Sequence, residues 1–192
     1  MSFLPESFAL EEQSAMLSLA RSAIVAALEN KPLQLPQPEP PCLTLRRGVF
    51  VTVHVTEKLR GCIGVIEGRE PLSASIPHCA QGAALHDPRF SSLRANELGE
   101  LQIEISVLSE LHAIAADQVE IGKHGLFVVA GDRRGLLLPQ VAVEHHLSRE
   151  QFLEETCRKA GLPRDAWRKP ETQLFGFTCE IFHENPGAAR AR

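Results

Sequence analysis

The stretch Leu101-Gln-Ile-Glu-Ile-Ser-Val-Leu108 decides the fold class of this 192-residue chain. Leucine, isoleucine and valine at its odd-numbered positions alternate with the polar residues Gln102, Glu104 and Ser106. A period of two predicts a β-strand with one face in a hydrophobic core and the other toward water. A strand with two different faces is typical of antiparallel sheets, because the strands of parallel sheets are buried on both faces.

Further strands are expected on both sides of this one. Val49 to Val55, with the sequence VFVTVHV, is rich in β-branched residues. Leu126 to Ala130 and Leu136 to Leu138 flank a polar, glycine-bearing segment, which predicts a hairpin. A last strand is expected over Leu174 to Phe182. These short strands can pair in antiparallel order.

Three helices are expected between the strands. Ala9 to Asn30 places apolar residues at helical spacing and ends before a Lys-Pro pair. Ser75 to Leu85 is rich in alanine. Ser148, with Gln151 three residues later, forms a capping box for a helix that ends at Gly161. Helices and strands alternate without a βαβ repeat, which predicts an α+β fold, with a mostly antiparallel sheet flanked by helices.

Two segments are expected to contain no regular element. Residues 31–41, KPLQLPQPEPP, hold five of the 13 prolines and favour extended backbone. Such a segment is either a recognition ligand or a stiff connector, and we favour the connector because proline-rich spacers are common. Residues 184–192, at the C-terminus, are expected to form a disordered tail.

The composition indicates a globular cytoplasmic protein with reduced thiols. Hydrophobic residues make up 44% of the chain, and no stretch approaches the roughly 20 apolar residues of a membrane span. The N-terminus lacks the basic-then-apolar order of a secretory signal. Five scattered cysteines argue against a disulfide framework. A formal charge of −4 argues against a general electrostatic attraction to nucleic acid.

Leu59-Arg-Gly-Cys-Ile-Gly64 is the clearest candidate site. Gly61 and Gly64 relax the backbone around Cys62 and leave space for a ligand to approach its amides. Arg60 supplies a permanent positive charge for a carboxylate or phosphate, and a nearby cation favours the reactive thiolate. In the alternative interpretation Cys62 is a small core residue, and the glycines only shape a turn.

Arg89 and His124 are further candidates. In Asp87-Pro-Arg89, which follows the end of a predicted helix, the two charged residues can form a local ion pair, or Arg89 can reach a ligand. His124 lies in the glycine-flanked segment GKHGL, where it can act as a general acid or base or bond to the backbone of a turn. Together, Cys62 and His124 would form a nucleophile and its base.

The sequence predicts neither a metal nor a cofactor. Eight histidines and five cysteines are present, but they form neither a Cys-x-x-Cys pair nor a His-Glu-x-x-His helix. No phosphate-binding motif of the Walker or Rossmann type occurs.

The LRGCIG stretch resembles the signature of the AMMECR-type domain family, and the resemblance continues in family order over about residues 45 to 183. The family usually has Gly-Trp where this chain has His146-Leu147, which puts a role for that loop in doubt. The other matching segments are Asp87-Pro-Arg-Phe90, Ile103 to Leu108, Gly122-Lys-His-Gly-Leu126, Gly135 to Ala142 and Lys159-Ala-Gly-Leu-Pro163.

The resemblance implies a compact α+β protein of two closely fused subdomains, with the LRGCIG stretch between them. The family domain is expected over residues 42–183, and the N-terminal helix within residues 1–30 is expected to pack on it. Bacterial and archaeal members, of the protein A type, belong to a gene trio with a Memo-like protein and a radical S-adenosylmethionine enzyme. Those two proteins are the partners that the resemblance implies.

Two functions follow from these residues. In the first, which we prefer, the chain is a ligand-binding or adaptor component, with Arg60, Gly61, Gly64 and Arg89 at the site of an anionic small molecule. In the second, the chain is an enzyme that uses Cys62 as nucleophile and His124 as base on an anionic small molecule. No complete catalytic set is evident in the sequence, which favours the first.

Overall fold

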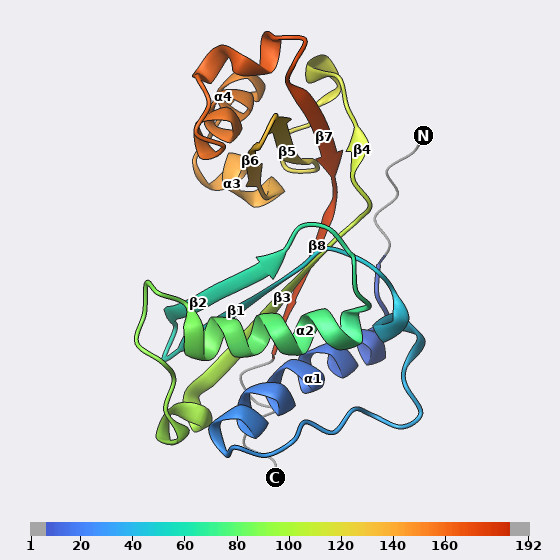
Figure 1. Cartoon of the computed structure of the whole chain (residues 1–192), viewed down its shortest axis with the longest axis vertical. Helices are drawn as coiled ribbons and strands as arrows, with labels where there is room; N and C mark the ends of the chain where they lie inside the picture. The colour runs from blue at the N-terminus through green and yellow to red at the C-terminus, as the bar shows by residue number, and fades with distance from the viewer. Residues whose placement is uncertain (1–6, 185–192) are drawn as a thin grey trace. The chain divides into compact units, whose positions relative to one another are not determined.

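The computed structural model describes residues 7–184 and divides them into two compact units. We call residues 7–108 together with 180–184 the large unit, and residues 109–179 the small unit. Each unit is built on a four-stranded sheet with helices packed against it (Figure 1). The predicted α+β class with antiparallel pairing is confirmed, with two sheets in place of the one expected.

The sheet of the large unit has the strand order β2-β1-β3-β8. Strands β1 (Val49–Val55) and β3 (Leu101–Leu108) have the predicted bounds. Strand β2 (Lys58–Val65) occupies a stretch in which the glycines were interpreted as relaxing or turning the backbone, and no strand was predicted there. That interpretation was wrong, because β1 pairs with β2 from Val49 opposite Val65 to Val55 opposite Lys58. Strand β8 (Cys179–His183) completes the sheet.

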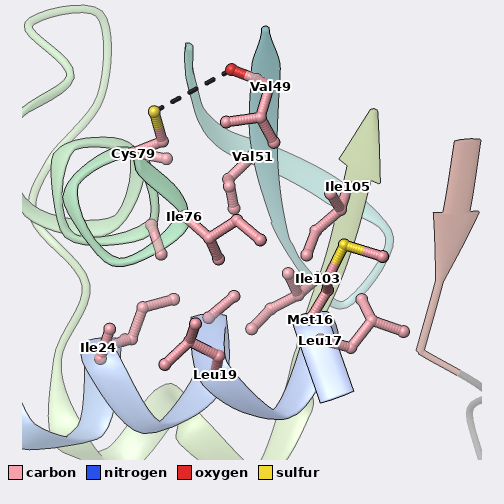
Figure 2. Close-up of a cluster of buried hydrophobic side chains, with 14 of the residues drawn as sticks. Met16, Leu17, Leu19, Ile24, Val49, Val51, Ile76, Cys79, Ile103 and Ile105 are labelled. Atoms are coloured by element: carbon pink, nitrogen blue, oxygen red, sulfur yellow. Dashed lines mark hydrogen bonds between the residues drawn. The ribbon is translucent and has the colours of Figure 1, made fainter. Parts of the chain in front are cut away.

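Helices α1 (Leu10–Leu28) and α2 (Leu72–Gln81) cover one face of this sheet. Figure 2 shows their apolar side chains meeting alternate residues of β1 and β3. Those of β3 are the residues that the strand periodicity assigned to the core. Helix α1 confirms the prediction to within two residues. Helix α2 begins three residues before the predicted start, and its last turn gives way to a π-helix, η2 (Gly82–His86).

The sheet of the small unit has the order β4-β7-β5-β6. Its strands are β4 (His112–Ala113), β5 (Gly125–Ala130), β6 (Arg133–Leu137) and β7 (Gln173–Phe177). The predicted hairpin is confirmed as β5–β6, whose two-residue turn begins at Gly131 with φ +58°.

Two helices belong to the small unit. Helix α4 (Arg149–Lys159) begins at the predicted capping box, in which the Gln151 amide donates to Ser148 Oγ at 3.3 Å. It ends before Gly161, which has φ +69°. Helix α3 (Pro139–Glu144) was not predicted.

Both units also contain short 3-10 helices. Those of the large unit are η1 (Pro41–Thr44) and η3 (Ala95–Glu100), and those of the small unit are η4 (Ala116–Gln118) and η5 (Arg164–Arg168).

The single strand predicted over Leu174 to Phe182 was wrong. The chain forms β7 and then β8, which belong to different sheets, with a break at Thr178. The Thr178 amide donates to Ser109 Oγ, and its carbonyl accepts from the Ser109 amide, each at 2.9 Å. These two hydrogen bonds take the place of ladder bonds at the break.

The predicted connector contains no helix or strand before η1. The predicted tail, 184–192, lies outside the described residues except for Glu184. Within residues 7–184, none of the helices combines the length and the apolar character needed to cross a membrane.

Candidate functional site

The LRGCIG stretch lies in β2, which forms one edge of the large sheet. Val53 pairs with Gly61 and His54 pairs with Leu59, so Arg60 is the extra residue of a β-bulge. A bulge interrupts the regular alternation of side chains and is often found where an edge strand redirects a residue. Arg60 is thus the residue of the motif that has no register partner in β1.

The two glycines of the motif permit close packing on opposite faces of β2. A Cβ atom at Gly61 would lie 1.9 Å from the carbonyl oxygen of Ala83, in the π-helix η2. A Cβ atom at Gly64 would lie 2.3 Å from the ring of Phe50. The protein itself therefore occupies the space that the sequence analysis left for a ligand, and a ligand contact at either glycine stays a prediction.

The backbone of Cys62 is held by side chains at the outer edge of β2. Its amide donates to Asp87 Oδ2 at 2.9 Å, and its carbonyl accepts from Arg89 Nη2 at 3.2 Å. In an antiparallel ladder, the N–H and C=O of one residue point to the same side of the strand. Asp87 directly follows the π-helix, whose Ala83 packs against Gly61, and this packing places the carboxylate beside Cys62.

Asp87 and Arg89 form the local ion pair that the sequence analysis expected. Arg89 Nη2 donates to Asp87 Oδ2 at 2.7 Å, and Arg89 Nε donates to Oδ1 at 3.0 Å. The side chain of Asp87 is 2% exposed and that of Arg89 is 58% exposed. The Arg89 guanidinium, together with the Cys62 amide, holds the pKa of the Asp87 carboxyl well below its usual range. The buried Asp87 carboxylate thus holds the exposed Arg89 guanidinium in one position.

The Arg60 side chain binds to the loop that follows the π-helix. Its Nη1 donates to Glu97 Oε1, and its Nη2 donates to the carbonyl and the hydroxyl of Ser91 at 3.2 and 3.3 Å. The hydrogen bond from Arg60 lowers the pKa of Glu97. Only 20% of the Arg60 side chain is exposed. An anionic ligand would have to share this guanidinium with Glu97, so a ligand role for Arg60 stays a prediction.

The Cys62 thiol lies on the face of the sheet opposite the helices. Thr52 is in register with Cys62 on one side and with Glu104 on the other, and the Thr52 hydroxyl donates to Cys62 Sγ at 3.3 Å. Cys62 is half-buried, whereas Cys79 is fully buried and its burial raises the pKa of that thiol to about 11. Cys62 is therefore the more accessible of these two thiols.

His124 belongs to the small unit and is buried, with 2% exposure. Its Nδ1 accepts from the Glu120 amide at 3.1 Å, so the proton of the neutral ring is on Nε2. Burial, and next the charge of Lys123, lower the pKa of His124. These contacts fit the backbone-bonded alternative. Because Cys62 belongs to the large unit, its pairing with His124 stays a prediction.

Sequence reasoning missed several partners of the motif. Glu97 and Ser91 lie more than 30 positions from Arg60, and no local pattern connects them. The pairing of Asp87 with the Cys62 amide also depends on tertiary structure. Across residues 7–184, no group of three or more His, Cys, Asp or Glu side chains is placed to hold a metal ion.

The AMMECR1 family model matches residues 17–182. A protein from Methanothermobacter thermautotrophicus is 40% identical over 183 residues, which cover 91% of this chain and 95% of that protein. A protein from Aquifex aeolicus is 38% identical over 177 residues, 88% of this chain and 91% of that protein. The crystal structure of an uncharacterized protein from Pyrococcus horikoshii is similar with a TM-score of 0.83 and 38% identity, covering 91% of this chain and 92% of that one. The chain belongs to the AMMECR1 family.

Proposed function

We propose that the chain is a ligand-binding component that recognises an anionic group through Arg89, beside Cys62. The observation that carries this proposal is the contrast within the ion pair: the Asp87 side chain is 2% exposed and the Arg89 side chain is 58% exposed. A buried carboxylate that accepts from Arg89 Nε and Nη2 fixes the guanidinium before any ligand arrives. Binding then loses less side-chain entropy than binding to a free arginine would.

The contacts of Arg89 also determine which side of its guanidinium can donate to a ligand. Nε and Nη2 are used by Asp87, and Nη2 also reaches the Cys62 carbonyl. The guanidinium lies over the Phe90 ring, with 5.3 Å between its Cζ and the ring centroid. The ligand group proposed here is therefore a small oxyanion, carboxylate or phosphate, that accepts from the outer side of Arg89.

Thermal unfolding with added inorganic phosphate or acetate tests this proposal. We expect either anion to raise the Tm of the wild-type protein saturably, because a ligand that binds only the folded state stabilises it. The effect should be lost in Arg89→Ala. The matched control is Arg69→Ala, since Arg69 is an exposed arginine that also pairs with a carboxylate two residues before it, Glu67. An equal Tm increase in Arg89→Ala and wild type would refute the proposal.

The partners in this proposal are a Memo-like protein and a radical S-adenosylmethionine enzyme, as the family resemblance implies. If the chain serves as their adaptor, co-purification with them should survive Cys62→Ser and be lost in Arg60→Ala. Because Arg60→Ala also removes a contact to Glu97, a Glu97→Gln variant is needed, which weakens that contact while keeping the arginine. Loss in both Arg60→Ala and Glu97→Gln would indicate a disturbed loop and count against a direct role for Arg60.

The enzyme alternative keeps one supporting observation: Cys62 is half-buried, and its carbonyl accepts from the Arg89 guanidinium. It predicts that Cys62 reacts with iodoacetamide at neutral pH faster than buried Cys157. Greater exposure alone would make Cys62 react faster than Cys157. Cys179, which is half-buried like Cys62, is therefore the informative comparison. Labelling of Cys62 no faster than that of Cys179 would remove the case for an activated nucleophile.

A further inference from the structure

Strand β2 forms one edge of the large sheet, and unpaired strand edges tend to pair with other chains. At Cys62, both the N–H and the C=O point away from β1 and reach Asp87 and Arg89 instead of another strand. A residue oriented in this way exchanges both hydrogen bonds with a single residue of a neighbouring strand in an antiparallel ladder. The carboxylate and the guanidinium therefore occupy the positions that a fifth strand would use.

The covering segment, residues 87–100, is attached at three places, two in β2 and one in the β1–β2 turn, and we call it the edge strap. Asp87 and Arg89 hold it at Cys62. Ser91 and Glu97 hold it at Arg60. Glu100, at its end, accepts from the hydroxyl of Thr56 in the β1–β2 turn at 2.5 Å. The attachments run from the hairpin turn to the middle of β2.

We infer that the edge strap prevents β2 from pairing with β2 of a second copy of this chain. Two identical strands related by a twofold axis are antiparallel, and this sheet already pairs its strands in that way. With Cys62 opposite its own copy, the outward N–H and C=O of each residue satisfy those of the other. Leu59, Ile63 and Val65 give the strand the apolar and β-branched character that favours such pairing.

The test is the oligomeric state of an Asp87→Ala/Arg89→Ala double variant of the full chain, measured by analytical ultracentrifugation. We expect its self-association to be at least about tenfold tighter than that of the wild type. The matched control is Glu67→Ala/Arg69→Ala, which removes an equally spaced carboxylate–arginine pair on the exposed surface and should leave self-association unchanged.

Oxidation with diamide identifies the edge that pairs. In a hydrogen-bonded antiparallel pair the two Cα atoms are about 5.5 Å apart, within disulfide range. The double variant should form a Cys62–Cys62 disulfide between copies, as the N=N bond of diamide takes up the two protons and two electrons that the thiols lose. Adding Cys62→Ser should abolish the disulfide and leave the self-association.

Two outcomes overturn the inference. One is a folded double variant whose self-association equals that of the wild type. The other is tighter association in both the double variant and the Glu67/Arg69 control, since a general loss of surface charge would then explain it. If the double variant fails to fold, Arg89→Ala alone decides the matter, because it opens the Cys62 carbonyl while leaving the Asp87 bond to the Cys62 amide. Unchanged self-association in folded Arg89→Ala would then refute the inference.

Discussion

Asp87 accepts hydrogen bonds from the Cys62 amide and from three nitrogens of Arg89. All of these bonds favour the ionised carboxylate, so the pKa of Asp87 in the folded protein lies below the value of about 3.9 expected for an unfolded aspartate. A group with a depressed folded-state pKa contributes stability above its unfolded pKa. That contribution is lost as the pH falls.

Replacing this carboxylate should therefore have an effect that depends on pH. We expect Asp87→Asn to lower the free energy of unfolding at pH 7, because the amide carries no charge to balance Arg89. The difference from wild type should begin to shrink below about pH 4, where the aspartate becomes protonated in the unfolded chain while Asp87 in the folded protein is still ionised, and it should shrink further as the pH falls toward the folded-state pKa. Urea denaturation at pH 7 and pH 3 measures this difference. Asp117→Asn, at an exposed position, is the control and should show little difference at either pH.

The glycines of the motif allow a second prediction at single positions. Gly61→Ala should destabilise the protein by about 2–3 kcal/mol, because its Cβ would meet the Ala83 backbone, which cannot rotate away. Gly99→Ala is the control: no atom lies within 4 Å of its Cβ, so we expect a change within about 1 kcal/mol. Similar losses in free energy of unfolding for the two variants would contradict the packing role of Gly61.

The same residues show what the sequence could reveal about the site. A cysteine between glycines, with arginine beside it, drew attention to β2, and the spacing of Asp87 and Arg89 predicted their ion pair. The spacing could not show that Arg60 binds Glu97, because the two meet only once the loop has folded against the strand edge. It also could not show that Ala83 fills the space over Gly61, since glycine favours turns and close packing alike.

Among the elements, the β1–β2 hairpin contains a strained turn. Thr56 and Glu57 form a two-residue loop in which φ is +49° and +64°. Glycine or asparagine is preferred at such positions, because other L-residues there cost roughly 1–2 kcal/mol each. Glu57→Gly should therefore stabilise the protein by about 1 kcal/mol against urea. Glu57→Ala keeps the strain and should give no gain; an equal gain in both variants would show that the strain lies elsewhere.

The end of β8 is tied to α1 and β3 by one carboxylate. Glu184 accepts from Nε and Nη2 of Arg21, each at 2.6 Å, and from the Ile103 amide at 3.1 Å. The side chain of Glu184 is 17% exposed and that of Arg21 is 25% exposed. Their charge-assisted hydrogen bonds therefore stabilise the fold more than those of a fully exposed pair would.

Glu184→Gln should lower the free energy of unfolding by about 1–2 kcal/mol. It should also speed hydrogen exchange of amides in β3 and β8, which hydrogen–deuterium exchange can follow. Glu29→Gln removes the exposed partner of Lys31 and should lower the free energy of unfolding much less than Glu184→Gln does, because water screens this surface pair. Equal losses in the free energy of unfolding for the two substitutions would mean that Glu184 does not hold β8 to α1 and β3.

Elements with strong local signals were predictable. The β-branched run of β1, the alternation in β3, the periodicity of α1 and the capping box of α4 each lie within a few neighbouring residues. Strand β2 was missed because its glycines resemble a turn, and its strand character depends on pairing with β1. The break at Thr178 was missed for a similar reason: the hydrogen bonds that replace the ladder come from Ser109, 69 positions away.

For the whole molecule, family membership and fold class agree with the sequence, and each unit has its own sheet and buried core. The residues at which the two units divide were harder to predict from the sequence, because the large unit is not continuous in the chain. The chain leaves the large unit after β3, forms the small unit, and returns to the large unit only at β8. The candidate site is thereby placed within one unit, where residues of β2 and the edge strap, 25 to 37 positions apart, come into contact.

The most direct test of anion recognition at the Arg89 guanidinium is an NMR titration of the full chain, labelled with nitrogen-15, with inorganic phosphate. We predict saturable shifts of the Arg89 Nε–H and Cys62 amide resonances, with those of distant residues such as Gly131 unchanged, and no saturable shift of the Cys62 amide in Arg89→Ala. Saturable shifts of the Cys62 amide that persist in Arg89→Ala, or an absence of saturable shifts in the wild type, would contradict anion recognition by this arginine.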